Sequence, residues 1–294
     1  MDLWHINQDS FDLKKMHSQE TVYTIGNGYF ATRGTFEENY FRANAATLLY
    51  GVFDDIDIGK EELANAPDWL PIKLFVNGER FRLTRGKILE YHRTLDMQNG
   101  VLSRTVRWES AGGVRLKIQS ERFASLADEH IGAIRYSVTA EEKPPEINEL
   151  KLLLRATFNM AVGNKDLMHW EPVEQWNEDE LVWLLSQTRH SSVQLLQTMS
   201  FTTQASGFSR EIFDSDTSPS IELQGKLAIG ETVTAEKIVV MYTTRDATDP
   251  VLAAFKHHHN MLRATGSAYQ LDTHRSFYEV LLTQNVEAWQ DYWK

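Results

Sequence analysis

The feature that most constrains this chain is a long alternation of apolar and polar residues between about Lys87 and Thr244. Successive side chains of a β-strand point to opposite faces, so a period of two predicts strands with one face on a core. In residues 149–158 the apolar face comprises Leu150, Leu152, Leu154, Ala156 and Phe158. The same alternation predicts strands over residues 114–119 and 134–139.

Turn-forming dipeptides separate these runs. Asn77-Gly78, Asn99-Gly100 and Gly112-Gly113 accept the positive φ angles that tight hairpin turns require. Hairpins join antiparallel strands, and no run is followed by the 10–15-residue helical pattern that a parallel crossover needs. We therefore predict an all-β fold for residues 1–247, a large antiparallel β-sandwich.

The pattern changes to helical after Asp249-Pro250, which can cap and begin a helix. We predict one helix from there to Gly266 and a second helix after it. The second carries an apolar stripe at spacings of three and four, formed by Tyr278, Leu282, Val286, Trp289 and Trp293. Residues 248–294 are thus predicted to be a helical linker. Because the stripe runs almost to the last residue, we expect it to contact a further domain that the chain lacks.

Composition excludes several classes of function. The 41 acidic residues outnumber the 30 Lys and Arg of the 294-residue chain, giving a net charge of −11. A negative field repels nucleic acids and anionic membranes, so neither is an expected partner. There are no cysteines, which excludes disulfides, Cys-ligated metal and thiol nucleophiles. With no leader-like start and no run of 18 apolar residues, we expect a cytoplasmic protein.

A glycine-rich segment raises the possibility of phosphate binding. Gly26, Asn27, Gly28 and Gly34 lie within nine residues. A phosphate loop, however, precedes a helix and carries a Lys and a Ser or Thr, and this segment has neither. We interpret these residues as structural turns, with nucleotide binding as the alternative.

Two other groups of polar residues are interpreted as structural. Consecutive residues of a helix point about 100° apart, so His257, His258 and His259 cannot converge on one metal ion. We therefore expect no metal site and no cofactor. The acidic pairs are interpreted as solvated loop charges without a catalytic role: Glu37-Glu38, Asp54-Asp55 and Glu61-Glu62.

Aromatic residues in a polar segment suggest a sugar site, because aromatic rings stack on sugar faces. His169 and Trp170 are the better candidates, with Trp69 and Trp176 beside them. The alternative is that these rings cover the edge of the core. Trp183 lies in an apolar run and is assigned to the core.

Ordered motifs give the chain a family resemblance. They are Glu20-Thr-Val-Tyr-Thr-Ile-Gly-Asn-Gly-Tyr29, Arg33-Gly34, Phe36-Glu-Glu38, Tyr50-Gly-Val-Phe-Asp54, Pro67-Asp-Trp-Leu70, Leu89-Glu-Tyr-His-Arg-Thr-Leu-Asp-Met97, Asn99-Gly-Val-Leu-Ser-Arg104, Ser120-Glu-Arg-Phe-Ala-Ser-Leu-Ala-Asp128 and His169-Trp170. With these blocks the chain resembles the N-terminal domain of glycoside hydrolase family 65, the maltose, kojibiose, nigerose and trehalose phosphorylases and related hydrolases.

The resemblance implies a galactose-mutarotase-like super-sandwich joined by linker helices to an (α/α)6 barrel. In that family a Glu of the barrel is the general acid, and inorganic phosphate, the co-substrate, attacks the anomeric carbon with inversion. No position of this chain matches the catalytic motif, so no catalytic residue is assigned.

We expect a non-catalytic domain that supports its own C-terminal barrel and borders the substrate entrance. The alternatives are an α-glucan-binding module that uses His169, Trp170, Trp69 and Trp176, a homodimerisation scaffold, and a stand-alone hydrolase with its own carboxylate pair. Which disaccharide is used, and whether phosphate or water is the acceptor, the sequence leaves open.

Overall fold

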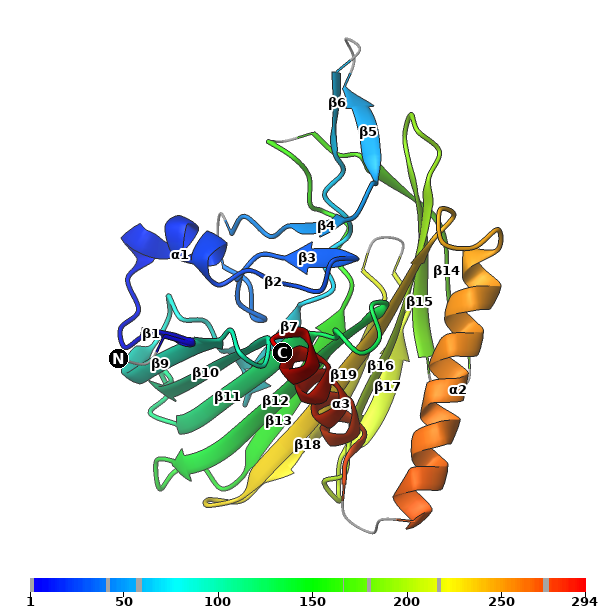
Figure 1. The fold of residues 1–294 in the computed structure, drawn as a ribbon. Coiled ribbons are helices and arrows are strands. Elements are labelled where there is room, and N and C mark those ends of the chain that lie inside the picture. The colour runs from blue at the N-terminus through cyan, green and yellow to red at the C-terminus, as the bar shows by residue number, and fades with distance from the viewer. Residues whose placement is uncertain are drawn as a thin grey trace.

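The computed structural model describes residues 3–40, 43–56, 60–165, 167–178, 181–215, 218–271 and 275–294. In these ranges the chain is mainly strand, with helices at its C-terminal end (Figure 1). Every strand pairing within the described ranges is antiparallel, as the turn dipeptides predicted. The described helices include none that is long and apolar enough to cross a membrane.

Two sheets form the sandwich. The larger has nine strands in the order β1 (His5–Gln8), β9 (Lys87–Asp96), β10 (Val101–Glu109), β11 (Arg115–Ala124), β12 (Ile131–Glu142), β19 (Thr232–Thr243), β16 (Gln194–Thr203), β15 (Leu181–Thr188) and β14 (Trp170–Glu178). The smaller has five strands in the order β17 (Ser209–Phe213), β18 (Ser220–Leu227), β13 (Leu150–Thr157), β7 (Ile72–Val76) and β8 (Glu79–Arg80).

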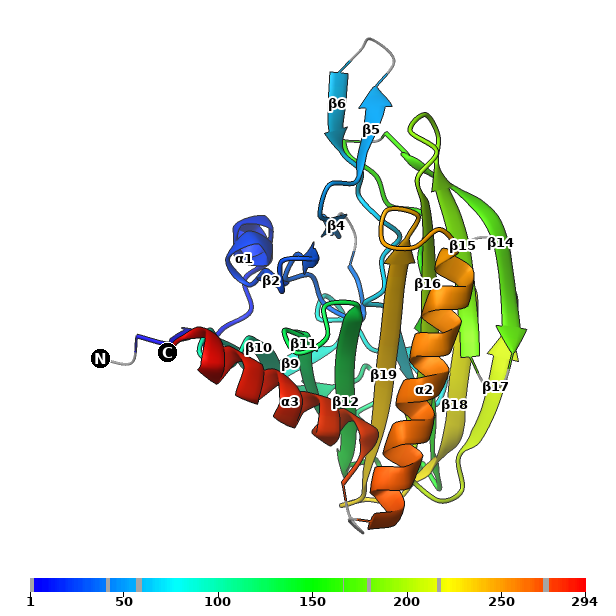
Figure 2. The same cartoon turned by 45° about the vertical axis from the view of Figure 1, so that its right-hand side comes forward.

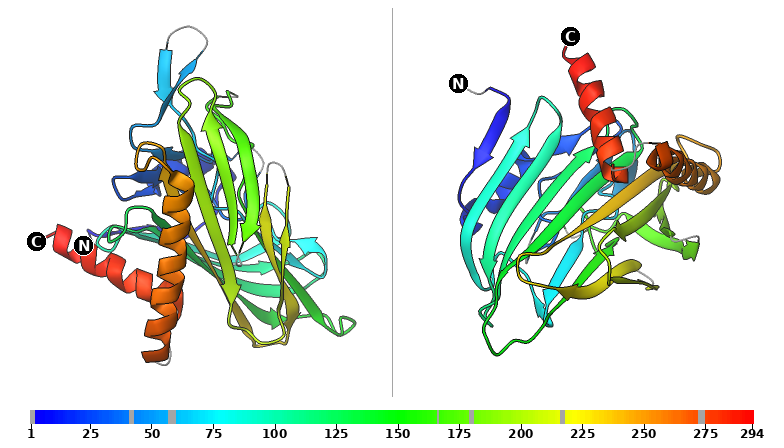
Figure 3. Two further views of the ribbon diagram at one scale, coloured as in Figure 1. Left: turned by 90° about the vertical axis from the view of Figure 1, so that its right-hand side faces the viewer. Right: turned by 90° about the horizontal axis from the view of Figure 1, so that it is seen from below.

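The N-terminal segment adds smaller elements. They are the 3-10 helix η1 (Leu13–Lys15), helix α1 (Met16–Val22), a three-stranded sheet of β2 (Ile25–Gly26), β3 (Phe30–Thr32) and β4 (Thr47–Leu49), and a hairpin of β5 (Phe53–Ile56) and β6 (Lys60–Leu63). This hairpin stands away from both large sheets (Figure 2; Figure 3, left).

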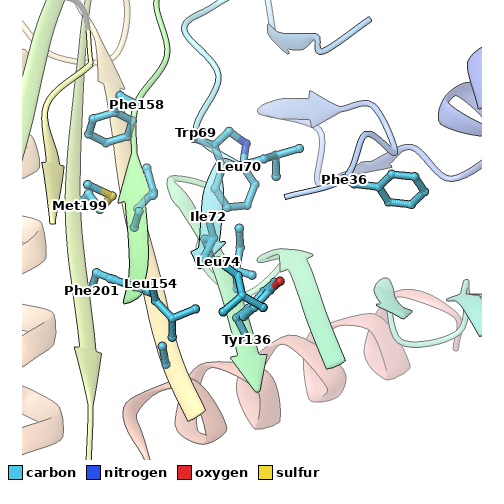
Figure 4. Packing of buried hydrophobic residues seen from close by; sticks show 14 of the residues in the cluster. Phe36, Trp69, Leu70, Ile72, Leu74, Tyr136, Leu154, Phe158, Met199 and Phe201 are labelled. Atoms are coloured by element: carbon cyan, nitrogen blue, oxygen red, sulfur yellow. The ribbon is translucent and has the colours of Figure 1, made fainter. Parts of the chain in front are cut away.

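The core lies between the two sheets, where the predicted alternation holds. Leu150, Leu152, Leu154 and Ala156 of β13 are buried, whereas Lys151 is exposed. Rings and aliphatic chains from both sheets interdigitate in this space (Figure 4): Trp69, Leu70, Ile72, Leu74, Tyr136, Leu154, Phe158, Met199 and Phe201. The turn between β7 and β8 has the predicted form, because Asn77 and Gly78 both have positive φ, 48° and 81°.

Helix α2 (Pro250–Leu271) packs along β16 and β19, and helix α3 (Phe277–Tyr292) lies against β12 and β19 (Figures 1 and 2). The predicted end of the first helix at Gly266 is wrong, since α2 continues to Leu271. A single helical glycine costs only about 1 kcal/mol relative to alanine, which tertiary packing can outweigh. Helix α3 instead begins at a capping box formed by Ser276 and Glu279.

Candidate functional site

The protruding hairpin β5–β6 is the most distinctive surface feature. Phe53 pairs with Leu63 and Asp54 pairs with Glu62 across it. Phe53, at 45% exposure, Leu63 and the preceding Tyr50 present large apolar side chains to solvent. Exposed apolar groups that gather on one element are typical of a contact surface.

A buried histidine anchors the base of this hairpin. His169 is only 1% exposed, and its Nδ1 lies 3.1 Å from Asp54 Oδ2 while its Nε2 lies 2.8 Å from Glu62 Oε1. Carboxylate oxygens are hydrogen-bond acceptors, so each ring nitrogen of His169 faces an acceptor. We call His169, Asp54 and Glu62 the His169 cluster.

Asp54 also binds the turn between β15 and β16. Its Oδ1 accepts hydrogen bonds from the backbone N–H groups of His190 (3.0 Å) and Ser191 (2.8 Å). Burial opposes ionisation of Asp54, but these two N–H groups and His169 outweigh it and lower the pKa of the carboxyl. The hydrogen bond from His169 likewise lowers the pKa of Glu62. The cluster therefore joins the hairpin, the segment before β14 and the β15–β16 turn.

The cavity beside the cluster is small. Its volume is about 140 Å³, and the lining residues are Asp54, Asp55, Leu167, Met168, His169, Arg189 and His190. Typical ligand pockets measure about 300–1,000 Å³. In this chain, therefore, the cavity does not enclose a disaccharide, and the chemistry that it displays is anchoring.

The structure places three of the four predicted sugar-binding residues out of reach. Trp69 is fully buried and donates from Nε1 to Thr32 Oγ1 at 2.9 Å. Trp170 and His169 are also buried, so these three side chains cannot stack on a sugar in this structure. Trp176 is 59% exposed on β14, opposite the buried Trp183. Only Trp176 of the four presents an accessible ring.

The predicted stripe on the second helix is divided between two surroundings. Tyr278 is buried, its ring 5.4 Å from that of Phe123 and its hydroxyl 3.1 Å from Glu121 Oε1. Leu282 and Val286 are half-buried. The expectation that the whole stripe awaits a further domain is thus wrong for Tyr278, which packs on the sheet of its own chain.

The end of α3 remains more accessible. Trp289 lies directly against Gly100, where any larger residue would clash with the indole, and this turn glycine has a φ of 65°. Trp293 is 46% exposed and its ring lies 4.9 Å from that of Trp4. A ring contact therefore joins a residue near the start of the described chain to one near its end.

Within the glycine-rich segment, Asn27 and Gly28 form the bend between β2 and β3. Asn27 Oδ1 accepts from the backbone N–H groups of Tyr29 (3.1 Å) and Phe30 (3.0 Å), and its amide also donates to Ser125 O at 2.7 Å. Gly28 has a φ of +94°. Gly26 lies in β2, and a Cβ on Gly34 would meet Tyr23 Cβ at 2.6 Å.

The first acidic pair is buried, so its interpretation as solvated is wrong. Arg104 donates to Glu38 (2.9 Å) and Glu37 (3.0 Å), and Arg122 donates to Glu37 at 2.8 Å. Burial disfavours the charge on Glu37, but Arg122 and Arg104 outweigh burial and lower its pKa. We call these four residues the arginine cluster. Asp54 of the second pair is likewise buried, whereas Asp55 is exposed.

A sequence signal for the arginine cluster exists. Arg104 and Arg122 fall at the inward-facing positions of β10 and β11, in register with Val106 and Ile118. An arginine among core positions requires a buried acid.

The three consecutive histidines point to different neighbours. His258 is buried, with Nδ1 2.7 Å from Thr198 Oγ1 and Nε2 3.2 Å from Ser200 Oγ. His257 lies 2.7 Å from Asp128, and His259 stacks near Phe255. The three rings diverge because consecutive side chains of a helix point in different directions.

Comparison with known proteins defines the class. The model described as "Glycosyl hydrolase family 65, N-terminal domain" matches residues 6–292. A solved structure titled "Putative kojibiose phosphorylase from human microbiome" aligns with 99% of this chain and 38% of its own, with a TM-score of 0.83 and 16% identity. The fold is therefore shared with that protein.

The chain belongs to glycosyl hydrolase family 65, as an N-terminal domain. A kojibiose phosphorylase of Halothermothrix orenii is 29% identical over 255 residues, covering 83% of this chain and 31% of the relative. An α,α-trehalose phosphorylase of Thermoanaerobacter brockii is 36% identical over 150 residues, covering 46% of this chain and 19% of the relative. The chain thus spans about a third or less of the length of these relatives.

Proposed function

We propose that this chain is the non-catalytic N-terminal domain of an inverting α-glucoside phosphorylase. It supports a C-terminal (α/α)6 barrel, and hairpin β5–β6 borders the substrate entrance of that barrel. The observation that carries the proposal is the hairpin itself, because the exposed apolar side chains of Phe53 and Leu63 lie at its base beside a buried ionic anchor. A surface loop that stands away from the core ordinarily frays, so such an anchor favours a role in positioning.

In the proposed whole enzyme the barrel supplies the chemistry. A barrel Glu donates a proton to the glycosidic oxygen while inorganic phosphate attacks the anomeric carbon from the opposite face, giving β-glucose 1-phosphate. Phosphate is already an anion, so no protein base is needed to activate it. The role of this chain is to hold the hairpin in place beside the site and to exclude water there.

The first test separates the chain from the barrel. The 294-residue chain is incubated with phosphate and kojibiose, trehalose, maltose or nigerose, and β-glucose 1-phosphate is measured. We expect no product from the chain alone and product from the same chain joined to its barrel. Release of β-glucose 1-phosphate by the isolated chain would overturn the non-catalytic assignment.

The second test addresses the hairpin in the barrel-containing protein. Phe53→Ala removes an exposed apolar side chain of the hairpin, and Phe213→Ala removes one of nearly equal exposure (43%) on β17 of the smaller sheet. We expect kcat/KM to fall several-fold with Phe53→Ala and to stay unchanged with Phe213→Ala. Equal kcat/KM for both variants would contradict the placement of the hairpin at the entrance.

A second candidate function is α-glucan binding by the sandwich, which the exposure of Trp176 favours. The test is titration with malto-oligosaccharides while tryptophan fluorescence is followed. Trp176→Ala should abolish the response, whereas Trp293→Ala, which removes another exposed ring just after the end of α3, should leave it. A wild-type chain that shows no change at millimolar sugar would exclude this candidate.

A further inference from the structure

A basic groove crosses the outer face of the five-stranded sheet. Its volume is about 350 Å³, and the lining residues are Asn39, Tyr40, Pro71, Lys73, Arg80, Arg82, Thr157, Asn159 and Ser218. Lys73 alternates with the buried Ile72 and Leu74 on β7, so it lies on the face away from the core. Three cations and, among the described residues, no acidic side chain line this groove, in a chain whose net charge is −11.

Positively charged residues face each other across the strands that form this groove. Lys73 is directly opposite Arg155 in the β7–β13 pairing, and Arg155 is paired with Glu222 on the next strand. Lys73 itself has no hydrogen bond or ion pair within the described part of the chain, and the same holds for the guanidinium of Arg82. Like charges opposite each other in a sheet are destabilising, and a bound anion would remove that cost.

The pKa of Lys73 agrees with this arrangement. Burial lowers it first, and repulsion from Arg80, Arg155 and Arg82 lowers it further. Arg80 donates from Nη2 to Glu38 O at 2.7 Å, which fixes its guanidinium at the groove, while its buried Nε has no partner within the described residues. An oxyanion in the groove would supply the missing acceptors.

A buried lysine lies beneath the floor. The amino group of Lys237 is buried inside the sandwich, 3.2 Å from Pro71 O and 3.0 Å from Thr157 O, and both of these residues line the groove. Burial lowers the pKa of Lys237 to about 7, so this group carries only part of a positive charge at neutral pH.

Neutral donors complete the lining. The amide oxygen of Asn159 accepts from Ala161 N at 3.0 Å, and that of Asn39 accepts from Tyr40 N at 2.7 Å. Each amide is therefore left with its NH₂ group as a donor, and Ser218 adds a hydroxyl. Cations and N–H or O–H donors without acceptors are the chemistry that recognises a phosphate group.

We propose that this groove binds a phosphate-bearing small molecule, either inorganic phosphate or the phosphate monoester of a sugar, through Lys73, Arg80 and Arg82. The volume falls in the range of ligand sites and leaves room for a hexose beside the phosphate. The site is separate from the His169 cavity, and the proposal does not depend on the barrel.

The test is calorimetric titration of the 294-residue chain at constant ionic strength in chloride. Three ligands are compared: inorganic phosphate, glucose 6-phosphate and unphosphorylated glucose. We expect the two phosphates to bind and glucose not to bind. Tighter binding of glucose 6-phosphate would identify a sugar phosphate as the ligand, and equal binding would identify the phosphate group alone. Binding of glucose as tight as that of its phosphate, or no heat with either phosphate, would overturn the proposal.

Variants locate the site. Lys73→Gln and Arg82→Gln each keep a long polar side chain, and each should weaken phosphate binding about tenfold or more by removing a charge-assisted hydrogen bond. The matched control is Lys226→Gln, which removes an exposed lysine of the same sheet outside the groove. A loss of affinity as large in the Lys226 variant as in the others would show nonspecific attraction and contradict the proposal, as would unchanged affinity in both groove variants.

Discussion

Two clusters hold buried carboxylates in different ways. The arginine cluster lies inside the sandwich and uses guanidinium groups, which stay charged at every pH at which the protein is folded. The His169 cluster lies at the base of the hairpin and uses one imidazole ring, which meets a carboxylate at each ring nitrogen. The first cluster fixes the body of the domain with two arginines, and the second fixes its protruding hairpin with a single histidine.

The clusters also differ in what they join. The arginine cluster ties the segment at Glu37 and Glu38 to β10, β11 and, through the Tyr136 hydroxyl, β12. The His169 cluster ties two short strands to a loop and a turn. We therefore expect loss of the first to unfold the domain more readily and loss of the second to loosen mainly the hairpin.

The largest effect is expected from Arg104→Met. This change removes the partner shared by Glu37 and Glu38 and leaves uncompensated charge in the core, which costs about 3–5 kcal/mol of the free energy of unfolding. The measurement is the urea midpoint of unfolding.

The matched control is Arg107→Met, on the same strand but facing solvent, where its ion pair with Glu141 is worth about 0–1 kcal/mol. If both variants lost the same free energy of unfolding, burial would not explain the contribution of the arginine cluster to stability.

The next effect is expected from His169→Phe, which keeps a planar ring but removes both ring nitrogens. Asp54 and Glu62 then lose a partner, at a cost of about 1–3 kcal/mol. Relative to the wild-type chain, the substitution should accelerate amide hydrogen exchange in β5 and β6 more than in β11 and β12.

The control is His92→Phe, which breaks an exposed pair with Asp9 and should change the free energy of unfolding by less than about 1 kcal/mol. Uniform acceleration across all strands would show that the hairpin is not held separately.

The sequence predicted what depends on local pattern. The alternation over residues 149–158 gave the buried face of β13, and the Asn77-Gly78 dipeptide gave the turn after β7. Both follow from the geometry of single strands and turns. The family resemblance placed the sandwich before the helices, and the shared fold confirms it.

What the sequence did not predict depends on segments distant in the chain. Glu37 and Glu38 were interpreted as a solvated pair because the arginines that bind them follow 66 or more residues later in the chain. Trp69 read as a ligand residue because its core neighbours come from other strands. Helix α2 continues past Gly266, which was predicted to end it, because a single glycine costs a helix only about 1 kcal/mol relative to alanine.

A second buried histidine, His258, extends the comparison, because its ring nitrogens face hydroxyl groups and not carboxylates. Burial lowers the pKa of His258 to about 3, and the neighbouring histidines add to this shift. Between pH 6.5 and 3 the unfolded chain binds a proton that the folded chain does not bind. The free energy of unfolding should therefore fall on acidification by up to about 1.4 kcal/mol per pH unit from this group.

The check on His258 is the variant His258→Gln, whose amide can replace both hydrogen bonds to Thr198 and Ser200. Unfolding free energies are compared at pH 7.5, 6.5, 5.5 and 4.5. The wild-type chain should lose more stability than the variant below pH 6.5, and parallel curves would mean that the folded state protonates His258.

The smallest effect is expected within one dipeptide of the hairpin. Asp54 faces His169, whereas its neighbour Asp55 is exposed and lies opposite Glu61 in the strand pairing. Asp55→Asn removes a repulsion between like charges and should raise the free energy of unfolding by about 0.2–1 kcal/mol. Asp54→Asn instead removes the charge that His169 and two backbone N–H groups require, so it should lower that free energy. Changes of opposite sign in the free energy of unfolding, measured with urea, would establish that the face of the strand on which each carboxylate lies decides its role. Changes of the same sign would mean that the total charge of the hairpin matters more than the His169 anchor.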